Sequence, residues 1–111
     1  MTYDLELAER VRQLVCFEPG TSEKAMFGGL AFLVNGHMAV AVSGQGGLML
    51  RVPPDHTDEV TVLPHAGPMV MSGRPARGWV RVDAAGCEDD AELETWVARG
   101  LDHARSLPPK E

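Results

Sequence analysis

The segment MFGGLAFLVNGHM, residues 26–38, constrains the fold more than any other part of the sequence. Asn35-Gly36 lies between two apolar runs, and this dipeptide favours a type I′ turn, in which both central residues need a positive φ. We therefore predict a β-hairpin that joins a strand over 24–34 to a strand over 37–43. Because both faces of the first strand are apolar, we expect it to be central, with both faces at least partly covered.

A two-residue turn fixes the register of this hairpin, because a slip by one residue would turn every side chain to the other face. The predicted pairs are Phe32 with Ala39, Ala31 with Val40 and Gly29 with Val42. They set large residues against small ones, which supports the register.

Gly28-Gly29 raises the alternative of a phosphate-binding loop. Such a loop follows the pattern GxxxxGK[ST] between a strand and a helix. Here the lysine is missing, and a hairpin follows in place of a helix. Glycine inside a strand is typical of a bulge or a close backbone approach, so we predict that the pair lets the strand bend and pack against a helix.

Apolar periodicity and turn residues predict the remaining elements. They are a helix over 3–16 with Thr2 as its N-cap, a strand over 48–52, a short helix over 55–60, strands over 68–72 and 77–83 joined by a loop over 72–77, and a helix over 90–106 that Asp89 caps. The order is α-β-β-β-α-β-β-α. Hairpins dominate it, so we predict an α+β fold with a mostly antiparallel five-stranded sheet flanked by helices. Residues 1–111 suit a single domain.

Charge and composition exclude several classes of protein. The net charge is −6, and because nucleic acid binding depends on phosphate neutralisation, direct nucleic acid binding is not expected. The N-terminus has no signal-peptide pattern and no apolar run reaches the length of a membrane span, so we predict a cytoplasmic protein. Cys16 and Cys87 are then thiols. We expect Cys16 to be buried, and the carboxylates beside Cys87 to raise its pKa and make it a poor nucleophile.

Motifs for catalysis or metal binding are absent from the sequence. The four histidines lack metal-site spacing, and no GxSxG nucleophile elbow occurs. His103 lies near the end of a predicted helix, where the cationic form of histidine is favoured. The acidic run over 88–94 is typical of a solvated helix start. We therefore predict no catalytic residue, no metal and no cofactor.

The arginines of SGRPARGWVRV are the strongest local charge feature. Arg74, Arg77 and Arg81 lie within eight residues, and Arg51 comes from a neighbouring predicted strand. Trp79 and Arg81 are two apart on a strand, so they share a face on which the guanidinium could stack on the indole. Such a cluster suits a carboxylate or phosphate ligand. The alternative is that these arginines pair with the acidic helices.

Three segments together carry a resemblance to a known family. MFGGLAFLVNGHMAVAV, GGLMLRV and SGRPARGWVRV, in this order and spacing, resemble the TfoX N-terminal domain family over about residues 5–105. The resemblance implies an α+β domain with an antiparallel sheet flanked by helices, and it supplies no catalytic residues. Its recurring positions are Met26, Phe27, Gly28, Gly29, Gly73, Arg74, Gly78 and Trp79. The family's competence regulators carry a second, C-terminal domain that this sequence does not contain, so we expect a stand-alone domain.

Three functional hypotheses remain open at this point. The first is a non-catalytic regulatory or protein-interaction domain, whose partner is an unknown protein or a second copy paired through a sheet edge. The second is a binder of an anionic small molecule or nucleotide. Its predicted ligand-binding residues are Arg51, Arg74, Arg77, Arg81 and Trp79. The third is an enzyme that uses Cys87 or His65.

Overall fold

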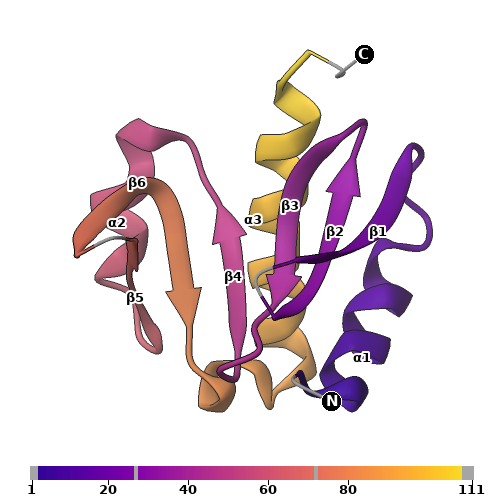
Figure 1. Cartoon of the computed structure of the whole chain (residues 1–111), viewed down its shortest axis with the longest axis horizontal. Coiled ribbons are helices and arrows are strands. Elements are labelled where there is room, and N and C mark those ends of the chain that lie inside the picture. Colours follow the sequence, from indigo (N-terminus) through magenta and orange to yellow (C-terminus); the bar gives the residue numbers. More distant parts are fainter. Residues whose placement is uncertain (1–2, 27, 72, 109–111) are drawn as a thin grey trace.

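A single antiparallel sheet organises the chain (Figure 1). The structure is a computed structural model that describes residues 3–26, 28–71 and 73–108. In this part of the chain the sheet has six strands in the order β1-β2-β3-β4-β6-β5. Their bounds are β1 Thr21–Met26, β2 Gly29–Val34, β3 His37–Val42, β4 Leu48–Arg51, β5 Ala66–Met71 and β6 Arg74–Val82. The predicted α+β class and antiparallel sheet are confirmed.

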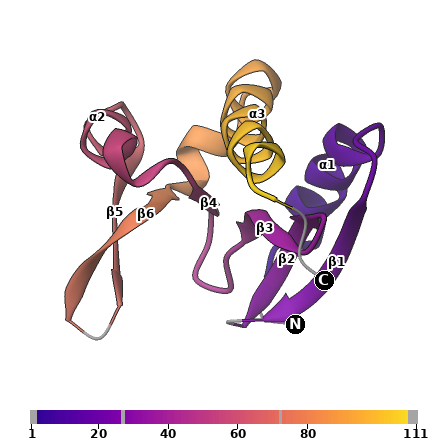
Figure 2. The ribbon, with the colours of Figure 1, turned by 90° about the horizontal axis from the view of Figure 1, so that it is seen from above.

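The helices lie on one side of this sheet (Figure 2). Their bounds are α1 Leu5–Val15, α2 Thr57–Thr61 and α3 Asp90–Ser106, with short 3-10 helices η1 Pro54–His56 and η2 Ala84–Cys87. The main core forms between them and the sheet, where Val11 and Leu93 pack in one cluster with Phe32 and Leu50. Most of it is aliphatic, because aromatic residues are only 5% of the chain.

The prediction of a single strand over 24–34 is wrong, because this segment forms parts of two strands, β1 and β2. Gly28 has a φ of +75°, and the chain reverses there, so that β1 pairs with β2 from Thr21 opposite Val34 to Met26 opposite Gly29. This turn raises the predicted five strands to six. Phe27 lies outside the described residues. A Cβ at Gly29 would overlap with the carbonyl of Val42, so its close approach is to strand β3 and not, as predicted, to a helix.

The Asn35-Gly36 turn is confirmed, with φ values of 52° and 87°. The predicted register is wrong beyond it, because Phe32 pairs with Val40 in place of Ala39. Ala39 is the extra residue of a β-bulge, which shifts the pairing by one while Phe32 keeps its place in the core. Ala31 pairs with Ala41, and Val42, the predicted partner of Gly29, pairs with Leu30.

The predicted loop over 72–77 is also largely strand, because β6 begins at Arg74. Pro75 favoured a loop in the sequence, but it lies in the outer half of β6, where only the edge strand β5 is paired with it. Gly78 has a φ of +84° within the irregular part of this hairpin. Its N–H donates to Thr57 Oγ1 at 2.7 Å, which ties β6 to α2.

The predicted helix over 90–106 is confirmed, and its cap is the predicted one, since Asp89 Oδ2 accepts from the N–H of Glu92 at 3.0 Å. The first helix begins later than predicted. Asp4 caps it by accepting from Leu7 N–H at 3.1 Å. The predicted cap, Thr2, lies outside the described residues.

Candidate functional site

The side of the sheet away from the helices is the candidate site, and we call it the open face (Figure 2). Alternate residues of each strand point toward it. A second apolar cluster covers it: Met26, Ala31, Leu33, Met38, Ala41, Met49, Met69 and Trp79. Four of the six methionines of the chain are in this cluster. Met38 and Met49 are buried within the cluster, whereas Met26 and Met69 are partly exposed. The described part of the chain places no helix over this face.

Two arginines and two apolar residues alternate at the centre of the open face. Arg51 of β4 lies opposite Trp79 of β6, and Met49 lies opposite Arg81. The Arg51 guanidinium is 5.5 Å from the centroid of the Trp79 ring. The stacking that the sequence predicted for Trp79 is therefore made by Arg51 and not by Arg81. Trp79 thus holds one of the two guanidinium groups in place.

A groove runs along the open face beside Arg81. Its volume is about 440 Å³, and it is lined by Ser43, Gln45, Met49, Pro68, Met69, Val70 and Arg81. Val70 is 58% exposed, which is high for a large apolar side chain. The groove therefore combines four apolar side chains with the polar residues Ser43 and Gln45 and one cation.

The charges that the strands place on the open face are all positive. Lys24 lies opposite Ala31, so it shares this face with Arg51 and Arg81. No ion pair joins these three cations to any other residue that the structure describes. The acidic residue of the strands, Glu23, faces the other way and binds Arg12 of α1 at 2.6 Å, which lowers the pKa of its carboxyl group.

The other predicted arginines do not join this site. Arg77 turns toward η1, where its Nη2 donates to the carbonyl of Pro54 at 3.1 Å and lies 3.7 Å from Asp55. Arg74 begins β6 at the far end of the β5–β6 hairpin. Of the predicted ligand-binding residues, the structure brings together Arg51, Trp79 and Arg81. The sequence analysis did not identify Met49 and Met69 as residues of this site. The alternation of side chains along their strands could have placed them on the same face as Arg51 and Arg81.

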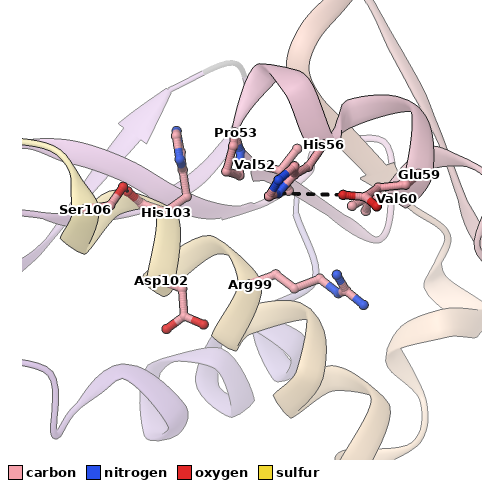
Figure 3. Close-up of a pocket in the computed structure, with 9 residues that line it drawn as sticks. All are labelled: Val52, Pro53, His56, Glu59, Val60, Arg99, Asp102, His103 and Ser106. Atoms are coloured by element: carbon pink, nitrogen blue, oxygen red, sulfur yellow. Dashed lines mark hydrogen bonds and ion pairs between the residues drawn. The ribbon is translucent and has the colours of Figure 1, made fainter.

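A second cleft, of about 300 Å³, lies between α2 and α3 (Figure 3). His56 Nδ1 lies 3.7 Å from Glu59, and Asp102 binds Arg105 at 3.1 Å. The Arg99 guanidinium lies 5.7 Å from the centroid of the Trp96 ring. His103 is 8% exposed, and burial lowers its pKa. Burial therefore outweighs the helix-end effect that the sequence suggested, and the cleft presents charges of both signs.

The two cysteines differ in environment. Cys87 is buried, and burial raises the pKa of its thiol to about 11, with a smaller contribution from Asp83. The predicted burial of Cys16 is wrong: it is exposed at the end of α1, where Val15 and, in part, Leu14 pack into the core. Among the described residues, no three His, Cys, Asp or Glu side chains form a group that could hold a metal. No helix in the described ranges is long and apolar enough to cross a membrane.

Comparison with known proteins adds one finding. The model of the TfoX N-terminal domain matches residues 13–104 of the 111-residue chain. Searches of curated proteins and of solved structures found no significant match. The matched region contains every strand of the sheet, and therefore the open face with its two arginines. The chain belongs to the TfoX N-terminal domain family.

Proposed function

We propose that the chain is a non-catalytic protein-interaction domain with a regulatory role, and that the open face binds the partner. The observation that carries this proposal is the methionine-rich cluster bordered by cations without ion pairs. Methionine adapts its shape and is common at binding surfaces. Tryptophan and arginine are enriched among the residues that dominate binding energies.

The environment of Cys87 supports a non-catalytic role. A thiol whose pKa is about 11, as for Cys87, is protonated at neutral pH and is a weak nucleophile.

The test compares two exposed valines. Val70 lines the groove, whereas Val62 follows α2 and is 81% exposed. Immobilised wild type and Val62→Glu should retain the same polypeptide from an extract of the cells that make the protein, and Val70→Glu should retain at least about tenfold less, a loss of about 1.4 kcal/mol. Equal retention by Val70→Glu, with all three proteins folded by circular dichroism, would contradict the proposal. Sedimentation of the purified chain distinguishes the binding of a different polypeptide from the formation of a homodimer.

A second candidate function is the binding of a small anion. The observation that favours it is the Arg51 guanidinium held over Trp79 beside Arg81, because arginine binds carboxylates and phosphates well. A nucleotide or acidic metabolite at about 100 times its Kd adds about 2.7 kcal/mol, which raises Tm by roughly 10 °C or more.

Two double variants locate such a site. The rise in Tm should disappear in Arg51→Gln/Arg81→Gln and persist in Arg74→Gln/Arg77→Gln, whose arginines lie elsewhere. A rise that survives both changes would place the ligand at another site.

A further inference from the structure

The open face is positively charged in an acidic chain. The net charge is −6, yet the charged strand residues on this face are Lys24, Arg51 and Arg81. Placing like charges against each other across an interface costs several kcal/mol. A protein that binds here therefore needs negative charge at the contact.

The two arginines have a defined spacing. They are diagonal neighbours on the adjacent strands β4 and β6, with Met49 and Trp79 at the other corners, and such neighbours lie about 7–8 Å apart. Residues i and i+2 of an extended segment are about 6.6 Å apart, and residues i and i+4 of a helix about 6 Å along its axis. Two carboxylates in either arrangement can reach both guanidinium groups.

The groove beside Arg81 supplies the apolar part of the contact. Met49, Met69 and Val70 line it, and Met69 is only half-buried in the chain by itself. A large apolar side chain next to a carboxylate would fill the groove while the carboxylate binds Arg81. Burial of such a side chain contributes the affinity, and the ion pairs set orientation and partner choice.

We propose that the open face binds an acidic, apolar segment of a partner protein, with carboxylates at Arg51 and Arg81 and a large apolar side chain in the groove. This inference rests on the proposed protein-interaction function. A nucleic acid fits less well, because three cations neutralise few phosphates and Trp79 is already covered by Arg51.

The experiment replaces Val70 with a photoreactive amino acid in the full chain and illuminates it in an extract of the cells that make the protein. Val62, on the helix side, is the matched control. Mass spectrometry then identifies the crosslinked segment. We expect a polypeptide in which Asp or Glu residues flank large apolar ones. Its yield should fall at least about tenfold in Arg51→Gln/Arg81→Gln and stay unchanged in Arg74→Gln/Arg77→Gln.

The outcomes separate this inference from the proposed function. A specific crosslink to a neutral or basic segment, or one that is insensitive to Arg51→Gln/Arg81→Gln, would overturn the inference and leave the protein-interaction function standing. If Val70 gives no polypeptide crosslink beyond that of Val62, or gives one to nucleic acid, both are overturned.

Discussion

His103 is a buried imidazole at the end of α3. It is 8% exposed, and its Nδ1 has no hydrogen-bond partner among the described residues. Its pKa is lowered first by burial and then by the charges of Arg51 and His37. The fold therefore favours the neutral form of this side chain.

A pH dependence of stability follows from this lowered pKa. Above an unfolded-state pKa of about 6.5, His103 is neutral in both states and contributes no pH dependence. As the pH falls below that value the unfolded chain binds the proton first, so the free energy of unfolding decreases. Urea unfolding at pH 7.5 and 5.5 should show a steeper loss in wild type than in His103→Gln. Glu23, whose pKa is lowered, stays ionised over this pH range in both proteins, so the difference isolates His103.

An equal loss of stability in the two proteins would show that His103 has the same proton affinity in the folded and unfolded states. That result would contradict the claim that burial disfavours the charged form of this side chain.

At the scale of elements, the backbone of α3 packs closely against the backbone of β3. Gly100 lies at this crossing, and a Cβ there would overlap with the carbonyl of Ala39 and lie 2.7 Å from Val40 Cγ1. Ala39 is also the bulged residue of β3. The glycine and the bulge therefore meet at one contact between helix and sheet.

Gly100→Ala tests this contact. Alanine is the better helix former by about 1 kcal/mol, but overpacking against backbone costs about 1–3 kcal/mol. We expect urea unfolding to show a net loss of stability. The control Ala98→Gly, at an exposed position of α3, should lose about 1 kcal/mol through helix propensity alone. A Gly100→Ala protein at least as stable as wild type would show that helix and strand can separate at little cost.

Local signals predicted the elements that depend on local chemistry. Asn35-Gly36 and the Asp89 cap are such cases, because a turn or a cap involves only a few neighbouring residues. The bulge at Ala39 was not predictable in this way, since it lies at a contact with α3, which is distant in the sequence. The turn at Gly28 also escaped prediction, because one positive φ within an apolar run leaves no periodic signal.

The candidate site was predictable only in part, for a topological reason. Strand β4 pairs with β6 and not with β5, and this long-range pairing sets Arg51 opposite Trp79. Spacing along the chain grouped Arg74 and Arg77 with Arg81, but Arg77 turns toward η1 and Arg74 lies at the far end of the β5–β6 hairpin. Alternation identified which residues share a face, and the sheet order decided which of them meet.

At the scale of the whole molecule, the two faces of the sheet differ in what covers them. Helices cover one face (Figure 2), and the other has the methionine-rich cluster, in which Met26 and Met69 are partly exposed and Met38 and Met49 are buried, together with Trp79 and the cations. The chain has a net charge of −6 but keeps its open face positive, and such charge separation speeds the approach of a negatively charged molecule to that face.

Hydroxyl-radical footprinting tests this surface most directly. The chain would be oxidised alone and with the retained partner fraction, and the reactivity of single side chains compared. Met69 and Val70 should lose reactivity when the partner is present, whereas Phe17 and Val62, which are 91% and 81% exposed, should keep theirs. Protection of Phe17 or Val62 with Met69 and Val70 unchanged would contradict the assignment of the open face as the binding surface.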